Sequence, residues 1–137
     1  MHRAKEYLLR YRADEVRYEQ LKEQYERLHA EAVGLRSPRL DGVRVQGGGG
    51  DGMDLKVAGL EELEQRLRKM FVEVADRKAE MLGEIQRLHD ARHMKILYLR
   101  YIKHKPLDDI ADEMHFSHDW VRHIHGEALD EFARINL

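Results

Sequence analysis

The chain has 137 residues, of which 36% are charged and 7% aromatic, and its formal net charge is −2 at pH 7. This composition favours long solvated helices over a thick core, and the absence of cysteine excludes disulfides, thiol catalysis and cysteine-bound metals. No apolar run approaches the roughly 20 residues that span a bilayer, and the N-terminus has no signal-peptide core, so we expect a cytoplasmic protein that does not enter a membrane.

Residues 2–33 predict one long helix. Its apolar and aromatic residues recur with heptad spacing, which indicates a coiled-coil seam, and Asp14 is the one polar interruption. We interpret the tyrosines as packing residues rather than as ligand-binding ones. Gly34 follows as the expected C-cap. The seam consists of Ala4, Tyr7, Tyr11, Tyr18, Leu21, Tyr25, Leu28 and Ala32.

Residues 34–58 hold seven glycines together with Pro38 and show no sustained period, so we expect a flexible linker. Residues 59–88 predict a second long helix, whose apolar stripe is interrupted by Arg77 and Lys78. Two helices of matched length joined by a flexible loop favour an antiparallel hairpin. Because each carries one narrow seam, these helices can pair within a chain, between chains, or both.

The remaining residues predict three shorter helices. Asp90 caps the first, which is either separate from the preceding helix or continuous with it. Pro106 suits the first turn of the second, and Ser117 is the N-cap of the third. The expected ranges are about 91–103, 106–114 and 118–135.

The last two of these helices have the pattern of a helix-turn-helix, which places its second helix in a DNA groove. Two steeply crossing helices need a small residue where they meet, and Ala111 stands there. The turn normally needs a positive φ, which glycine usually supplies, and His115 occupies that position. The apolar residues that anchor the two helices are Leu107, Ile110, Met114, Phe116, Val121 and Ile124.

With its inner face anchored, the second helix exposes side chains that fit a major groove about 12 Å wide. Arg122 can donate two hydrogen bonds to guanine, Asp119 can accept one from cytosine, and Trp120 either stacks or covers the joint between the helices. The residues expected to face bases are His118, Asp119, Trp120, Arg122 and His123. The residues expected to face phosphates are Arg100, Lys103, Lys105 and Ser117, with Arg92 and Lys95 beside them.

The charge distribution is less typical of a DNA-binding protein. Basic and acidic residues are equal in number in 1–34 and in 35–88, and 89–137 holds seven basic and nine acidic residues. Seven of the nine histidines also lie in 89–137, so this segment can gain positive charge in mild acid. If His118 or His123 meets a phosphate, DNA affinity should rise as pH falls from about 7.5 to 6.

Two histidine spacings admit a metal site, namely His89 with His93 and His115 with His118. Because no cysteine or clear carboxylate ligand accompanies them, we expect no metal and no other cofactor. The acidic residues follow helical periods and are expected to be solvated. Nothing resembles a nucleophile elbow, a kinase loop or a catalytic carboxylate pair, so the sequence indicates a protein that is not an enzyme.

The C-terminal segment resembles the helix-turn-helix of sigma factor region four. The shared residues are Ile96-Leu97, Leu99-Arg100-Tyr101, Ile110-Ala111, Ser117, Val121 and Ala128-Leu129. The combination of Trp120 with His125-Gly126 and Ala128-Leu129 is similar to a narrower group, the RinA/ArpU-like transcriptional regulators of phages and prophages of Gram-positive bacteria. That group is also similar in outline, with a charged N-terminal helix, a Ser-Pro/Gly-rich middle and a second helix.

The resemblance implies a phage- or prophage-encoded, sequence-specific regulator of late-gene transcription that binds double-stranded DNA in the bacterial cytoplasm, with host RNA polymerase as a further partner. We expect an all-α protein with a hairpin or coiled-coil oligomerisation region at 1–88 and a helix-turn-helix domain at 89–137, acting as a homodimer. Two alternatives remain open: a DNA-packaging adaptor resembling a small terminase subunit, and a module that binds polymerase without touching DNA.

Overall fold

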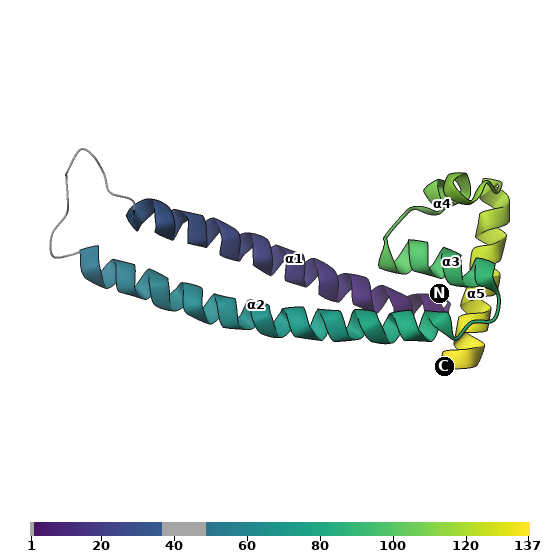
Figure 1. Cartoon of the computed structure of the whole chain (residues 1–137), viewed down its shortest axis with the longest axis horizontal. Coiled ribbons are helices and arrows are strands. Elements are labelled where there is room, and N and C mark those ends of the chain that lie inside the picture. The colour runs from purple at the N-terminus through teal and green to yellow at the C-terminus, as the bar shows by residue number, and fades with distance from the viewer. Residues whose placement is uncertain (1, 37–48) are drawn as a thin grey trace. The chain divides into compact units, whose positions relative to one another are not determined.

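The computed structural model describes residues 2–36 and 49–137, with side chains described at 2–34 and 58–137. All regular structure in these residues is helical, which confirms the predicted all-α class (Figure 1). The elements are α1 (Arg3–Arg36), α2 (Gly49–Gln86), α3 (Ala91–Leu97), the π-helical turn η1 (Tyr98–Ile102), α4 (Leu107–Met114) and α5 (His118–Asn136). None of the described helices is both long and apolar enough to cross a membrane.

The ends of the two long helices differ from the sequence prediction. α1 continues past Gly34 to Arg36, so Gly34 is not its C-cap. α2 begins at Gly49 rather than at residue 59, so the last part of the predicted linker is helical. This part contains no proline, and its glycines lower helix propensity without blocking a helix. The rest of the predicted linker, residues 37–48, lies outside the described residues.

The predicted helix at 91–103 is separate from α2 and has a change of helical type within it. The α2 helix ends at Gln86, and Asp90 caps α3 by accepting a 2.8 Å hydrogen bond from the Arg92 backbone N–H. Hydrogen bonds from Arg92 lower the pKa of Asp90 to about 2. After α3 the backbone widens into η1, where the Lys103 N–H donates to the Tyr98 carbonyl at 3.1 Å.

Residues of α3 and η1 contribute to two hydrophobic clusters. Leu97, Tyr101 and Ile102 are buried in a large cluster, whereas Ile96 and Leu99 are buried in a smaller one with α4 and α5. A helix with a single regular period presents one stripe. Here Ile96 and Leu97 are adjacent and point to different clusters, and the wider π-helical turn of η1 shifts the direction of the side chains that follow.

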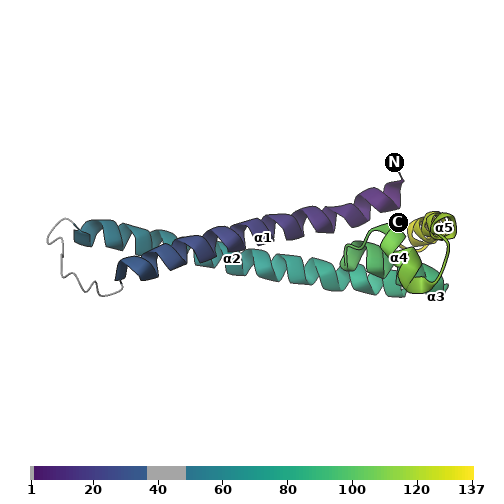
Figure 2. The same cartoon turned by 90° about the horizontal axis from the view of Figure 1, so that it is seen from above.

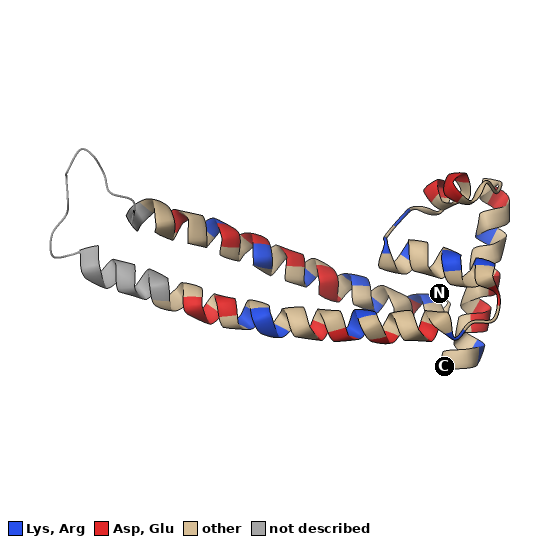
Figure 3. Ribbon diagram, in the orientation of Figure 1, with Lys and Arg blue, Asp and Glu red and all other residues tan. Residues whose placement is uncertain are grey.

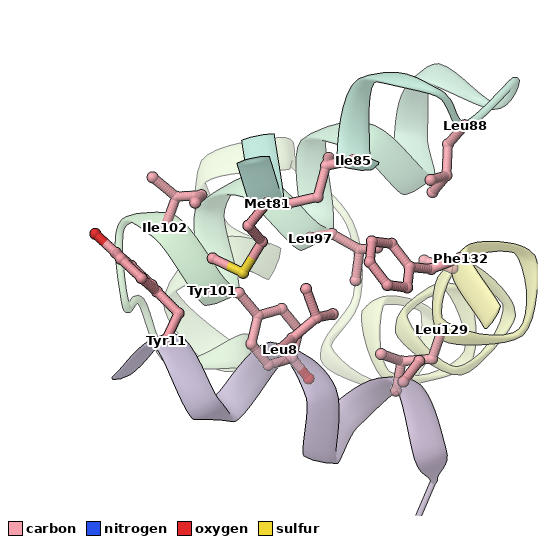
Figure 4. Packing of buried hydrophobic residues seen from close by; sticks show 12 residues of the cluster. Leu8, Tyr11, Met81, Ile85, Leu88, Leu97, Tyr101, Ile102, Leu129 and Phe132 are labelled. Carbon is pink, nitrogen blue, oxygen red and sulfur yellow. The ribbon is translucent and has the colours of Figure 1, made fainter. Parts of the chain in front are cut away.

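The described residues divide into two compact units, which we call the core unit (residues 1–15 and 74–137) and the hairpin unit (residues 16–73). The large cluster of the core unit joins side chains from α1, α2, α3, η1 and α5 (Figure 4). Its buried members include Leu8, Ile85, Leu88 and Phe132. The sequence prediction divided the chain between residues 88 and 89, and this cluster contains residues from both sides of that division.

The polar interruptions of the two predicted seams contact each other within the core unit. Arg77 Nε lies 3.2 Å from Asp14 Oδ2. Asp14 is the charged residue in the seam of α1, and Arg77 is one of the two charged residues that interrupt the apolar stripe of α2. About two turns away along each helix, the Tyr7 hydroxyl donates to Glu84 at 2.8–2.9 Å. Because polar contacts between seam positions favour one alignment of two helices, this ion pair and this hydrogen bond favour the observed register of α1 against α2.

In the hairpin unit, the described parts of α1 and α2 run antiparallel, as predicted (Figures 1 and 2). Tyr18 and Phe71 contact each other with ring centroids 5.9 Å apart. The seam is narrow, since Tyr25 and Leu28 are only half-buried and Phe71 remains 56% exposed. The hairpin unit therefore has helix pairing without the multi-helix core of the other unit.

Candidate nucleic-acid interface

The turn between α4 and α5 is closed by the backbone in the way that the sequence predicts. His115 has φ 59° and ψ 40°, so it adopts the left-handed conformation expected at this position. The Phe116 N–H donates to the Ala111 carbonyl at 2.9 Å, and the His115 N–H donates to the Asp112 carbonyl at 3.3 Å. These two bonds form a Schellman motif, which ends α4 sharply and redirects the chain toward α5.

Ser117 begins α5 as its N-cap. Its Oγ accepts a 3.0 Å hydrogen bond from the Trp120 N–H, and a cap of this kind contributes about 1 kcal/mol. The predicted inner face is buried as expected: Ile110 and Ala111 of α4 and Val121 and Ile124 of α5 are 0% exposed and pack in the smaller cluster. These contacts hold one face of α5 against α4. The opposite face of the first turns of α5, which we call the outer face, is exposed to solvent.

All five residues predicted to face bases are exposed on this outer face of α5. Asp119 is the most exposed side chain among them, at 98%, and Arg122 and His123 are more than half exposed. The Trp120 ring lies against the ring of His123, with centroids 5.3 Å apart, and 42% of Trp120 is exposed. The outer face therefore combines a guanidinium, two imidazoles, a carboxylate and an indole.

The cationic groups of the outer face are paired with carboxylates of the same chain. Arg122 lies 3.1 Å from Asp119 and 3.3 Å from Asp108. His118 lies 3.3 Å from Asp108 and 3.2 Å from Asp112. Figure 3 shows that Asp and Glu, in red, cover much of α4. Carboxylates therefore surround the basic side chains of the outer face, and their negative charge weakens the attraction of this face for a polyanion such as DNA.

His123 has its own carboxylate partner further along α5. Its Nε2 lies 2.9 Å from Oε1 of Glu127, at i, i+4 spacing on the same helix. The second oxygen of Glu127 lies 3.5 Å from Nε2 of the buried His93. Glu127 therefore links the outer face of α5 to the interior of the core unit.

The residues predicted to face phosphates lie in η1 (Arg100), between η1 and α4 (Lys103 and Lys105) and at the start of α5 (Ser117), and each already has a contact within the chain. Arg100 Nη1 donates to the Lys105 carbonyl at 3.0 Å, and the Lys105 ammonium lies 2.6 Å from Glu113. A hydrogen bond from Lys105 lowers the pKa of Glu113. Lys103 lies 6.0 Å from the centre of the Tyr98 ring, and the Ser117 hydroxyl is used in the helix cap.

The histidines of the C-terminal segment do not form one group that gains charge together. His125 is buried, 2.9 Å from the Tyr101 hydroxyl, and burial lowers its pKa to about 4, so this histidine does not add to the charge that the segment 89–137 can gain in mild acid. His93 is buried with its Nδ1 donating to Glu131 at 2.9 Å, and His104 lies 2.7 Å from Glu15. Only part of the predicted histidine charge is therefore on the surface.

The ion pairs of this face were not predicted from sequence: Asp119 was expected to face a base, and Asp108 and Asp112 were not named as site residues. The i, i+3 spacing of Asp119 and Arg122 was a signal that could have indicated one pair. Asp108 and Arg122 are 14 residues apart, so their contact follows only from the three-dimensional turn. Across the ranges 2–34 and 58–137, no three or more His, Asp and Glu side chains are arranged to hold a metal ion.

The sequence of this chain matches one known family. The family described as "Protein of unknown function (DUF1492)" matches residues 34–132, more than two thirds of the chain. The matched segment includes α3, η1, α4 and most of α5. No curated protein and no solved structure shows a significant match.

Proposed function

The chain belongs to the DUF1492 family, and we propose that it is a sequence-specific double-stranded DNA-binding protein that regulates transcription through its α4–α5 unit. The observation that carries this proposal is the division of α5 into two faces. Val121 and Ile124 are fully buried, whereas Arg122 and His123 between them are exposed beyond a sharp Schellman turn. A helix anchored on one side and polar on the other is the arrangement used to read a major groove.

The wider biological setting belongs to the same proposal and rests on the resemblance to sigma factor region four and to RinA/ArpU-like regulators. We place the protein in the cytoplasm of a bacterium that carries a phage or prophage, with late genes as its targets. It acts without catalysis and without a cofactor, and host RNA polymerase is a further partner.

We further propose that the protein acts as a homodimer, so that two α5 helices contact two half-sites. Phe71 and Val72 of α2 are each more than half exposed, which supports a second copy as a partner of the hairpin unit. The mass in solution, measured by light scattering, tests this point. A dimer is the expected result, whereas a ring of eight or more chains would favour the DNA-packaging alternative.

The DNA-binding proposal is tested with duplexes that the protein itself selects from a random-sequence library at low salt. We expect Arg122→Ala and His123→Ala to weaken binding to the selected duplex about tenfold and to relax its sequence preference, because each removes a donor from the outer face. The matched control is Arg134→Ala, which removes an exposed arginine near the far end of the same helix. Unchanged affinity and preference in Arg122→Ala and His123→Ala would remove α5 from the proposal.

A second candidate function is favoured by the acidic setting of the outer face. Because the three carboxylates Asp108, Asp112 and Asp119 outnumber the one arginine among them, this face also suits a basic protein surface. The candidate is a module that binds RNA polymerase without touching DNA. It predicts polymerase capture together with no duplex binding at any salt concentration, whereas a DNA-binding protein loses affinity steeply as salt rises.

A further inference from the structure

Asp108 is the carboxylate of α4 that contacts two basic side chains at the start of α5. Its Oδ1 lies 3.3 Å from Nδ1 of His118 and 3.3 Å from Nη2 of Arg122. Asp112 and Asp119 each contact one of these side chains, so within the described part of the chain Asp108 alone contacts both. It belongs to the first turn of α4, whereas its two partners lie beyond the turn.

We propose that Asp108 competes with DNA for Arg122 and His118, and so restrains DNA binding by the free protein. This inference rests on the proposed function. The Arg122 Nη2 group that contacts Asp108 is one of the donors that Arg122 would direct to guanine, so it cannot serve both partners at once. A duplex that engages Arg122 must first replace this partner.

The exposure of Asp108, Arg122 and His118 determines how strongly Asp108 can reduce DNA affinity. The side chains of Asp108 and Arg122 are each 56% exposed, and His118 is 47% exposed. Exposed ion pairs are weak and are screened by salt. Removing the Asp108 carboxylate should therefore raise DNA affinity about three- to tenfold at low salt, and less at high salt.

A neighbouring residue provides a control with the same charge change. Asp109 is exposed in the same first turn of α4, and it forms no ion pair with any residue whose side chain the structure describes. Asp108→Asn and Asp109→Asn each remove one negative charge from the same helix end. Only Asp108→Asn also removes the carboxylate that contacts Arg122 and His118.

The experiment measures the affinity of the full chain for a 30-base-pair random-sequence duplex and for a selected duplex by fluorescence anisotropy. We expect Asp108→Asn to tighten binding three- to tenfold and Asp109→Asn to tighten it less than twofold. In an Arg122→Ala, His118→Ala background, the effect of Asp108→Asn should fall to that of Asp109→Asn. Thermal melts followed by circular dichroism verify that each variant is folded.

The possible failures are distinguishable. Equal tightening by Asp108→Asn and Asp109→Asn would show a general charge effect and would overturn this inference while leaving the proposed function in place. Persistence of the Asp108→Asn effect without Arg122 and His118 would overturn it as well. If the unmodified chain and both variants all fail to bind duplex DNA at low salt, the proposed function falls and this inference falls with it.

Discussion

α1 has a different environment in each of the two units. In the core unit its residues Ala4 and Leu8 are 0% exposed, because α2, η1 and α5 also contribute to the cluster around them. In the hairpin unit Tyr25 and Leu28 continue the same heptad pattern and are only half-buried. A heptad pattern therefore predicts which face of a helix is apolar, whereas the elements packed against that face determine how deeply its larger side chains are buried; the small Ala32 of the same seam is 4% exposed.

The largest expected effect comes from comparing the same substitution at two positions of α1. Leu8→Ala should lower the free energy of unfolding of the core unit by about 3 kcal/mol, because it leaves a cavity in a closed cluster. Leu28→Ala should cost about 1 kcal/mol, because Leu28 is half-buried and solvent can fill the space. Hydrogen exchange followed by mass spectrometry reports each unit separately. Equal losses of protection would contradict the contrast between the units.

A smaller effect concerns the buried His125, whose pKa is lowered to about 4 by burial and by the nearby charges of Arg100, Lys5 and His2. An exposed histidine in the unfolded chain titrates near pH 6.5, so between pH 6.5 and pH 4 the unfolded chain binds a proton that the folded chain does not. Lowering the pH from 7 to 5 should therefore destabilise the core unit through His125 by on the order of 1–2 kcal/mol.

The test of this pH dependence replaces the imidazole with an amide that does not titrate. His125→Gln should reduce the loss of stability between pH 7 and pH 5, as measured by urea unfolding at each pH. His29→Gln, at an exposed position beside Tyr25 in the hairpin unit, is the control and should leave the pH dependence as it is. A pH dependence that survives His125→Gln would assign the effect to other groups.

A small gain in stability is expected in both units when a helical glycine is replaced by alanine. Gly59 lies within α2 of the hairpin unit and Gly126 within α5 of the core unit, and a Cβ added at either position meets nothing within 4 Å. Gly59→Ala and Gly126→Ala should each stabilise their own unit by about 0.5–1 kcal/mol, because alanine has the higher helix propensity. Thermal melting and hydrogen exchange measure the gain. Destabilisation by either substitution would show that local propensity does not decide stability at that position.

The features predicted from sequence are those that depend on neighbouring residues. Ser117 and Asp90 cap their helices as expected, and His115 has the positive φ that the turn requires. Caps and turns arise within a few residues, so a local pattern contains the information needed to predict them. The anchors Val121 and Ile124 follow from helical spacing in the same way.

The features that sequence could not predict depend on residues far apart in the chain. The cluster around Leu8 includes Phe132, and the partner of Arg122 on α4 is Asp108. The lowered pKa of His125 depends on burial among several elements, which the histidine content of the segment does not specify. Each of these follows from packing between elements, which a single-sequence pattern of period and charge does not specify.

The core unit also has a consequence for how the chain matures. His2 lies 2.6 Å from Asp130, and these residues are separated by 128 positions. During synthesis at roughly 5–20 residues per second, the first helical turns of α1 wait on the order of ten seconds for their partners in α5 to be made. Through that interval Ala4 and Leu8 have no cluster to enter. The helices therefore complete this core only after α5 has left the ribosome, whereas the residues of the hairpin unit are made earlier.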